Sequence, residues 1–585
     1  MANEHYAKFI AEAFVKPIRS VLIVDDDYPT LEEILDKEIA KKGDGEPPAT
    51  NKTWYRNPER IKRVIDGFRK PERPLLVDIH DGVNVDAKGD AKVASHLHQS
   101  DLLVLDYELD KARRGDGARA IEILRGLMAN DHFNLVVVHT SEDLDKAYRE
   151  IILGLLGPME TSLTGEERAV VDELIADRED AEEGILDALH QAVIVDQYLH
   201  ARLHPDTYLR TMGKKEQPYT GFAVLADEAN WDNASRKLVL RRLLSDAEKP
   251  LRPQLNGTSA AGLKWSKSAV KWVKAESVFI AFSNKSDHDD LFADLQTALE
   301  AWNPAPSRLF MAKLRAEMDE YGVVAQTEAL ERQHALAHWY ARLLRSEGDE
   351  RRWLIAESVG RHSDQLLNII LRRVESFASG LVEAEAKAAG KEVDARCLQH
   401  FSVDLSKEQS KKRAEREHNA LVSSKAPEGW HLTTGHVLTM DDDYWVCLSP
   451  LCDLVPGQAA TRNADFGDRL PFMAVKLHPV AADGDHDVNS NLYLFLTLED
   501  GVKKFCFNSQ GKDSTAPIWR TFYAERRGLL DKNFNLKVSV MSAGSKRLIA
   551  TVHRSQIVAQ LRYEYALNLL QKLGVSMTRI GLDFV

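Results

Sequence analysis

Three short apolar segments in the first 140 residues end in acids or in a hydroxyl, and this pattern constrains the fold most strongly. Residues 20–27 end in Asp25-Asp26-Asp27, residues 101–106 end in Asp106, and residues 134–140 end in Thr140. A strand that is apolar along its length is buried on both faces, as in the parallel sheets of α/β proteins. The helical spacing of apolar residues in 31–39 and 117–127 supplies helices to cover such a sheet.

Two further segments complete the predicted sheet. Residues 74–79 are also apolar, and strand character returns at 277–285, followed by an amphipathic helix that ends at Asn303-Pro304. The sequence therefore predicts a doubly wound α/β domain with five parallel strands. Ligands of such sheets bind beyond the carboxyl ends of the strands. The acids and the hydroxyl at the strand ends are expected to meet there.

At these positions the sequence resembles the receiver domain of bacterial response regulators. Val24-Asp25-Asp26-Asp27 is similar to its acidic motif and Val104-Leu105-Asp106 to its phospho-acceptor strand, with Thr140 as its switch hydroxyl and Lys285 as its fifth-strand lysine. The resemblance covers about residues 21–302. It implies a flavodoxin-like fold in which Asp106 accepts a phosphoryl group.

Transfer of a phosphoryl group to a carboxylate needs a hard divalent cation that neutralises charge on the oxygens. Mg²⁺ prefers oxygen ligands and keeps several waters, so a few protein ligands are enough. We assign Asp25, Asp26 and Asp106 to the metal site, and the resemblance adds the backbone carbonyl of Glu108. Lys285 is expected to pair with Asp106 before the reaction and with the phosphoryl group after it.

Each of these assignments has a simpler alternative. Three consecutive acids are also typical of a solvated loop or a helix cap, and Lys285 is equally compatible with a solvated strand end. Ser141 replaces Thr140 if the register is shifted by one residue. Asn284 before Lys285, with no proline after it, departs from the family's usual Lys-Pro ending. A receiver that keeps its fold without being phosphorylated is a further alternative.

The distance between Thr140 and Lys285 predicts an insertion. These residues lie 145 positions apart, whereas a receiver needs only a short helix and two loops there. We expect a receiver domain at 1–303 with a helical insertion at about 142–270, an all-α domain at 304–426, and a β-rich domain at 427–585. The last is expected to be a small antiparallel barrel or sandwich with a closing helix at 556–573.

Composition narrows the partners and the compartment. No apolar run reaches the ~18 to 20 residues of a membrane span, and the N-terminus lacks a secretory signal, so we expect a cytoplasmic protein with reduced cysteines. The formal net charge of −13 argues against a surface built for nucleic acid, although a local basic patch is compatible with it. The basic run 407–416 contains interleaved glutamates and is better interpreted as a solvated helix face.

The function expected from these features is signalling. The chain is interpreted as an atypical response regulator that a histidine kinase phosphorylates on Asp106 and that passes the signal to its C-terminal domains, without an enzymatic activity of its own. Its architecture suggests a stress or antiviral defence module, and a homodimer is compatible with the sequence. The alternative is a receiver-gated effector whose β-rich domain is an enzyme such as a ribonuclease, using Cys452 and Asp453. A free cysteine is more often a small buried hydrophobe, so we expect Cys452 to be buried.

Overall fold

The computed structural model divides the chain into two compact units. They are Met1–Ala316 with Phe377–Glu385, and Glu317–Ser376 with Ala386–Val585. The description below covers residues 4–42, 52, 58–70, 74–80, 100–109, 115–159, 163–181, 184–212, 218–257, 262–266, 268–285, 290–330, 332–456, 466–480, 492–508 and 516–578. The proposed division into receiver, helical and β-rich domains stays a prediction, because helices α14 (Pro306–Leu330) and α16 (Gly348–Ala389) each contribute residues to both compact units.

The first unit contains a seven-stranded sheet in the order β2-β1-β3-β4-β7-β6-β5. Five strands run parallel, as the sequence predicts: β1 (Ser20–Val24), β2 (Leu76–His80), β3 (Leu102–Leu105), β4 (Asn134–Thr140) and β7 (Val278–Asn284). The predicted strand number is wrong, because β5 (Lys264–Trp265) and β6 (Trp272–Lys274) add an antiparallel edge. Strands of two and three residues are too short to show the alternation that marks a strand in a sequence.

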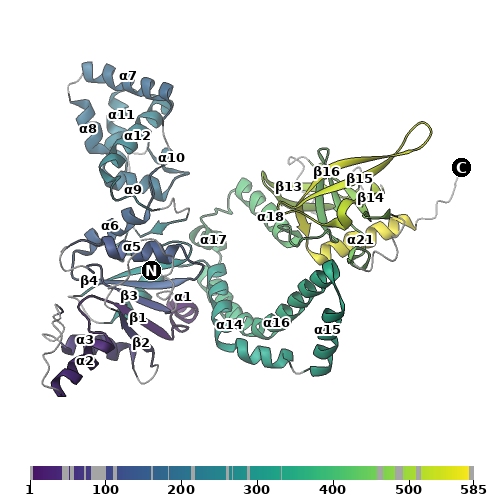
Figure 1. The fold of residues 1–585 in the computed structure, drawn as a ribbon. Coiled ribbons are helices and arrows are strands. Elements are labelled where there is room, and N and C mark those ends of the chain that lie inside the picture. The colour runs from purple at the N-terminus through teal and green to yellow at the C-terminus, as the bar shows by residue number, and fades with distance from the viewer. Residues whose placement is uncertain are drawn as a thin grey trace. The chain divides into compact units, whose positions relative to one another are not determined.

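Helices cover both faces of this sheet, which gives three layers (Figure 1). Successive strand residues point to opposite faces. In β3, Leu103 and Leu105 pack with α5 (Ala118–Met128) and α6 (Leu144–Leu155), whereas Leu102 and Val104 pack in the opposite core. The helices of that opposite face are α1 (Glu4–Ile10), the π-helical turn η1 (Ala11–Val15), α3 (Pro58–Phe68) and α13 (Leu291–Trp302). A further helix, α2 (Leu31–Lys42), follows β1.

Helix boundaries in this unit follow local capping chemistry. Asp143 accepts a hydrogen bond from the Lys146 N–H at 2.8 Å and begins α6, and Asp290 does the same for Ala293 at the start of α13. A side-chain acceptor of this kind satisfies one of the free N–H groups of the first turn. Helix α13 ends at Asn303, which takes a left-handed conformation before Pro304. This is the helix end that the sequence predicts.

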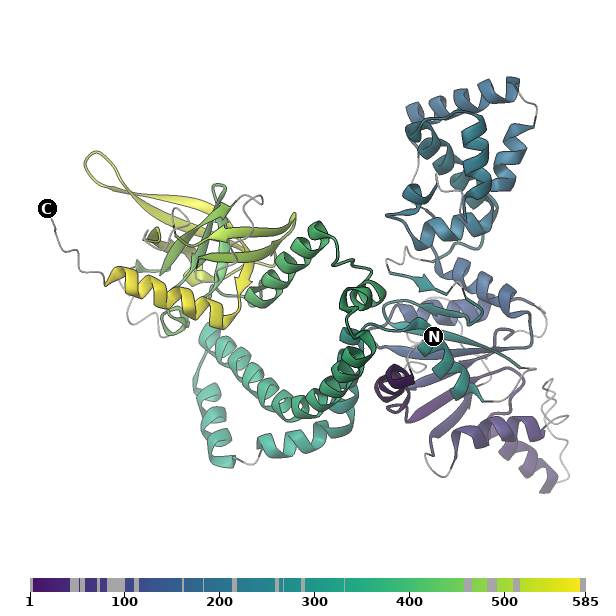
Figure 2. The same cartoon turned by 180° about the vertical axis from the view of Figure 1, so that it is seen from behind.

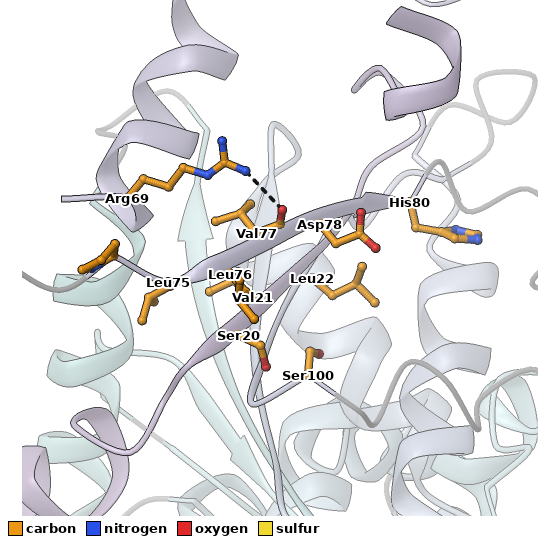
Figure 3. A pocket seen from close by; sticks show the side chains of 11 residues that line it. Ser20, Val21, Leu22, Arg69, Leu75, Leu76, Val77, Asp78, His80 and Ser100 are labelled. Carbon is orange, nitrogen blue, oxygen red and sulfur yellow. Dashed lines mark hydrogen bonds between the residues drawn. The ribbon is translucent and has the colours of Figure 1, made fainter. Parts of the chain in front are cut away.

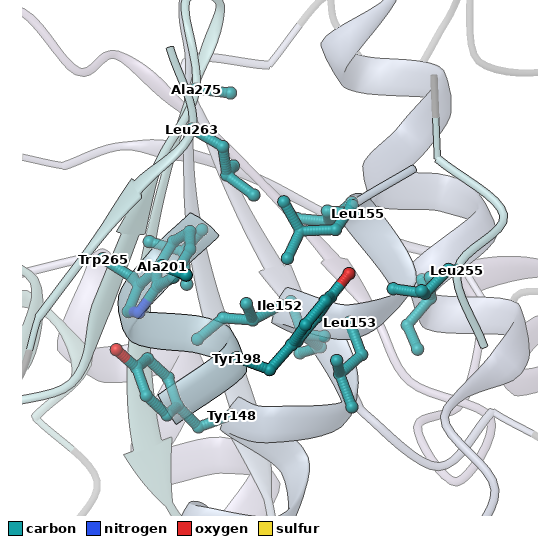
Figure 4. Packing of buried hydrophobic residues seen from close by; sticks show 14 of the residues in the cluster. Tyr148, Ile152, Leu153, Leu155, Tyr198, Ala201, Leu255, Leu263, Trp265 and Ala275 are labelled. Atoms are coloured by element: carbon teal, nitrogen blue, oxygen red, sulfur yellow. The ribbon is translucent and has the colours of Figure 1, made fainter. Parts of the chain in front are cut away.

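A bundle of helices lies in the chain between β4 and β7. After α6 come α7 (Gly165–Ala181), α8 (Ile185–Ala192), α9 (Val195–Leu203), α10 (Tyr208–Thr211), α11 (Thr220–Glu228), α12 (Asn233–Glu248) and the 3-10 turn η3 (Lys249–Leu251). These helices share one hydrophobic core with the sheet, and α6 is the element between them. Figure 4 shows Tyr148 and Ile152 of α6 near Tyr198 of α9 and Trp265 of β5. Any displacement of α6 is therefore transmitted to the bundle by direct packing.

A pocket of about 630 Å³ lies along β1 and β2 at the edge of the sheet (Figure 3). Its lining includes Leu22 and Leu76, and the Arg69 guanidinium donates to the Val77 carbonyl at 3.4 Å beside it. None of the site residues predicted from the sequence lines this pocket. It is therefore separate from the strand ends described below.

The second unit begins with helices and ends in a barrel. Its helices are α15 (Gln333–Arg345), α17 (Val393–Phe401) and α18 (Glu408–Ser423), together with parts of α14 and α16, and short helical segments occur at α19 (Leu451–Leu454) and η6 (Glu525–Gly528). The barrel strands are β9 (His436–Met440), β10 (Asp443–Cys447), β11 (Leu470–Val480), β14 (Trp519–Ala524), β15 (Asn535–Ala543) and β16 (Leu548–Leu561). Pairing of β10 with β11 closes the antiparallel ring. The predicted barrel is confirmed.

Other elements extend this barrel. β13 (Gly501–Cys506) pairs with β11 and with β12 (Tyr493–Leu498), and β8 (Ser424–Lys425) pairs with β16. The closing helix α21 spans Tyr563–Met577, so the helix start predicted at residue 556 is wrong. Ile557, Ala559 and Leu561 are buried at alternate positions, which is the period of a strand. Among the helices that the structure describes, none has the length and apolarity needed to cross a membrane.

Candidate functional site

The parallel register of β1, β2 and β3 brings two acids to one edge of the sheet. Asp25 follows β1 and its N–H donates to the His80 carbonyl at the end of β2, at 3.1 Å. Asp106 follows β3 and its N–H donates to the Val24 carbonyl at 2.8 Å. Each acid continues the ladder of its own strand, so the side chains emerge together at the carboxyl ends.

The carboxylates of Asp25, Asp26 and Asp106 form a compact cluster. One oxygen from each lies within 4.8 Å of the others, and Asp25 and Asp106 are buried. The Asp25 carboxylate also accepts from the Asp27 N–H at 2.9 Å, which fixes the acidic loop after β1. This is the cluster of oxygen ligands that the sequence predicts for a hard divalent cation.

Lys285 contacts two of these three carboxylates. Its Nζ is 2.9 Å from Oδ2 of Asp25 and 2.8 Å from Oδ2 of Asp106. The Lys285 N–H donates to the Thr140 carbonyl at 2.7 Å, which continues the pairing of β7 with β4 by one residue. Arg60 of α3 donates to the Lys285 carbonyl from the other side. The lysine is therefore held by its backbone as well as by its two ion pairs, and it is not a solvated strand end.

Burial sets the electrostatics of the site. Burial, followed by the charge of Asp25, raises the pKa of Asp106 to about 7, although Lys285 opposes the shift. Burial also disfavours the charged form of Lys285, but the two carboxylates outweigh it and raise the lysine pKa above its usual value. The environment thus favours the protonated form of Lys285 and disfavours ionisation of Asp106. A second cation near the cluster would relieve this excess of negative charge.

Thr140 and Glu108 flank the cluster. Thr140 is fully buried at the end of β4, and its Oγ1 accepts from the Glu142 N–H at 3.0 Å. The Glu108 N–H donates to Oδ1 of Asp106 at 3.3 Å, and the Glu108 carboxylate accepts from the Gly115 N–H. The Glu108 side chain therefore contacts Gly115, whereas the Glu108 backbone contacts Asp106.

Sequence reasoning missed the residue after the acceptor. Tyr107 is fully buried and its hydroxyl donates to the Glu150 carboxylate on α6. Burial and this bond raise the pKa of Tyr107. A Cβ on Gly117 would lie 2.0 Å from the Tyr107 ring, so the glycine leaves the space that the ring fills. The Gly115-Asp116-Gly117 run signals this packing in the sequence, but its partner becomes visible only in the fold.

The cysteine site considered in the β-rich region has a different environment from the one expected. Cys452 is exposed, so the prediction that it is a buried hydrophobe is wrong. It lies on α19, which follows Pro450 at the barrel surface, and its Sγ is 3.7 Å from Oδ1 of Asp453. Among the described residues, the acidic cluster at the receiver strand ends is the group that meets the spacing of a metal site.

The comparison with known families agrees with this geometry. Residues 17–191 match the model of a family described as a response receiver domain. This match identifies a receiver domain in this part of the chain. The matched segment contains Asp25, Asp26, Asp106 and Thr140, and it extends beyond β4 through α6 and α7, while Lys285 lies outside it. The chain matches no curated protein and no solved structure.

Proposed function

We propose that this protein is a response regulator that accepts a phosphoryl group on Asp106 with Mg²⁺ bound and transmits the change through α6. The observation that carries the proposal is the buried cluster in which Lys285 contacts both Asp25 and Asp106. A buried lysine between two carboxylates at strand ends adds little stability, because desolvation costs offset much of the attraction. Its placement suits a site whose charge changes during function.

The residues present fit a magnesium ion. One oxygen from each of three carboxylates lies within 4.8 Å of the others, and Lys285 contacts two of them. Burial, followed by the charge of Asp25, raises the pKa of Asp106, so a further cation would favour its ionised form. Asp25, Asp26 and Asp106 would hold the ion together with the Glu108 carbonyl. When bound, Mg²⁺ neutralises charge that develops on the phosphoryl oxygens during transfer.

The protein's own groups define the transfer step. A carboxylate oxygen of Asp106 attacks phosphorus, the bond from phosphorus to the donor breaks, and the electron pair of that bond leaves with the donor. Lys285 moves its contact from the Asp106 carboxylate to a phosphoryl oxygen. The Thr140 hydroxyl accepts from Glu142 in the resting state, which leaves its proton to donate to the new oxygens. A histidine kinase is the donor that we propose.

Transmission is proposed to run through Tyr107 and α6. Tyr107 adjoins the acceptor in the chain and binds Glu150 of α6. Helix α6 packs in the same core as the bundle of α7 to α12 (Figure 4). Phosphorylation replaces the single charge of the Asp106 carboxylate by a phosphoryl group that carries about two negative charges. Lys285 and Thr140 then contact the phosphoryl oxygens, which changes the contacts at the ends of β4 and β7. The bundle is therefore the proposed first recipient of the signal.

The test is phosphorylation of the full chain by acetyl phosphate in the presence of Mg²⁺. The wild type should gain a hydroxylamine-labile acyl phosphate, and Asp106→Asn should abolish it. Asp131→Asn is the matched control, since Asp131 is exposed in the loop before β4 and should label normally. The absence of labelling in the wild type, under conditions that label a known receiver, would refute the proposal.

A ribonuclease activity of the barrel, the alternative from the sequence, has only the exposed Cys452 beside Asp453 to support it. This pair brings together a thiol and one carboxylate, whereas Asp106 lies in a buried cluster with a lysine and two further carboxylates. The receiver chemistry therefore remains the proposed function.

A further inference from the structure

The hairpin of β15 and β16 extends beyond the barrel (Figures 1 and 2). β14 pairs with β15 only at Ser539 and Val538, and β9 reaches β16 only from Gln556 onward. Residues 540–543 and 548–551 pair with each other and with no other strand that the structure describes. Four residues at about 3.4 Å each carry this ribbon ~14 Å past its last neighbour, before the turn is counted.

The ribbon is strongly basic in an acidic protein. From Lys532 to Arg562 the chain contains six lysines and arginines and no aspartate or glutamate, although its formal net charge is −13. Lys537, Lys546, Arg547 and Arg554 are exposed, and none forms an ion pair with a residue that the structure describes. At the base of the ribbon, Nδ1 of His553 contacts the Asp441 carboxylate at 2.6 Å.

Two of these charges face each other directly. Lys537 and Arg554 are register partners across the two strands. Like charges at such a position repel and destabilise a sheet. The pairing becomes favourable when an anion lies between the two side chains. Lys546 and Arg547 add two more positive charges at the turn, so cations occupy both ends of the exposed ribbon.

The side chains between the charges are small or apolar and face solvent. Leu548 is 68% exposed and Val552 is 51% exposed, and Met541 and Ile549 are also exposed. The register places Met541 and Leu548 on the face that carries Lys537 and Arg554, whereas Ile549 lies on the opposite face. Exposed apolar side chains on both faces require a partner that surrounds the ribbon.

We propose that residues 537–554, here named the arm, bind duplex DNA by entering its major groove. That groove is about 12 Å wide and about 8.5 Å deep and admits a two-stranded β-ribbon. The ~14 Å reach of the arm exceeds this depth. Lys537 and Arg554 would contact phosphates at the groove edge, and Lys546 and Arg547 would contact phosphates farther along it. The exposed side chains between them would contact base edges.

The same features disfavour other polyanions. An anionic membrane binds helices or hairpins with one apolar face, whereas the arm has two. Single strands are held by bases stacked on aromatic side chains, and residues 537–554 contain no phenylalanine, tyrosine or tryptophan. Duplex RNA has a major groove too narrow for side chains to read. The inference is independent of the phosphoryl chemistry at Asp106.

Binding is tested on the unphosphorylated full chain by fluorescence anisotropy with a short duplex DNA. Four phosphate contacts predict a slope of about −3.6 in log affinity against log salt, hence an affinity loss of ~150-fold between about 50 and about 200 mM salt. K546Q/R547Q should weaken binding and reduce this loss to ~12-fold. Both side chains are exposed in a turn, so the variant should fold normally.

K411Q/K412Q is the matched control. It removes the same charge from α18, where Lys412 pairs with Glu408, and it should bind DNA like the wild type. Equal weakening by both variants would overturn the proposal, because binding would then reflect total charge alone. No binding to duplex DNA, or equal binding to duplex RNA, a single strand or anionic vesicles, would also overturn it.

Discussion

Replacing Asp106 by asparagine should stabilise the metal-free receiver, and the gain should grow with pH. Burial and Asp25 raise the pKa of Asp106 from 3.8 to about 7. An acid with a raised pKa in the folded state binds more protons there than in the unfolded chain between these two values. Its contribution to the free energy of unfolding therefore falls as pH rises from about 4 to about 7. Asparagine does not ionise in either state and avoids this loss.

The expected size follows from the same shift. At about 1.36 kcal/mol per pKa unit, ionising Asp106 costs on the order of 4 kcal/mol at pH 8 and about 1 to 2 kcal/mol at pH 5. The packing of the new amide adds a constant that is equal at both pH values. The change in the difference between variant and wild type from pH 5 to pH 8 is thus the diagnostic quantity, and we expect about 2 to 3 kcal/mol.

Hydrogen exchange of the β1 and β3 amides in the presence of a chelator measures this locally, which avoids assuming that both units of the chain unfold together. The wild-type to variant ratio of exchange rates should increase by up to ~100-fold from pH 5 to pH 8. For Asp131→Asn, at an exposed position, this ratio should not change between pH 5 and pH 8. A flat ratio for Asp106→Asn, or a variant that loses protection at pH 8, would refute the argument from burial.

Three further predictions follow from the same geometry. Raising Mg²⁺ should move the midpoint of the pH profile of acetyl phosphate labelling to lower pH, because the cation opposes protonation of Asp106; an unmoved midpoint would argue against metal contact with that carboxylate. In the presence of a chelator, Lys285→Met should lower the free energy of unfolding by ~3 to 5 kcal/mol, because it leaves buried carboxylates without their cation. Added Mg²⁺ should restore part of this loss, and hydrogen exchange measures both effects. Gly117→Ala should cost ~1 to 3 kcal/mol through its clash with Tyr107, whereas Gly67→Ala in α3, with open space around it, should stabilise by ~0.5 to 1 kcal/mol in the same measurement.

The sequence predicted the sheet because its central strands are buried on both faces. β3 and β4 are buried at every position, and polar residues occur at their carboxyl ends, where the site lies. The edge strands β5 and β6 carry no such signal, since two or three residues show no period. The predicted helix start at residue 556 was wrong for a related reason. The burial of residues 557–561 alternates along the strand, but their residue types do not show this alternation clearly in the sequence.

The part of the site that was predictable from the sequence is the set of polar residues at the ends of apolar strands. The contacts of Lys285 with Asp25 and Asp106 depend on β7 pairing beside β4, although Thr140 and Lys285 lie 145 positions apart in the chain. The bond from Tyr107 to Glu150 depends on α6 packing next to α5, which no spacing in the sequence expresses. Overall charge also concealed the arm, since a stretch with six positive charges and no acids is outweighed by the rest of an acidic chain.

The charge balance of the receiver links its metal, its phosphoryl group and α6. Three clustered carboxylates face one lysine, so a divalent cation and then a phosphoryl group change the local charge in opposite directions. The Lys285 N–H donates to the Thr140 carbonyl, so the lysine that would contact the phosphoryl group is anchored at the end of β4. Helix α6 begins three residues after Thr140 at its Asp143 cap. The helix that binds Tyr107 therefore receives the change from both neighbouring strand ends, which makes α6 the element whose exchange protection should respond first to phosphorylation.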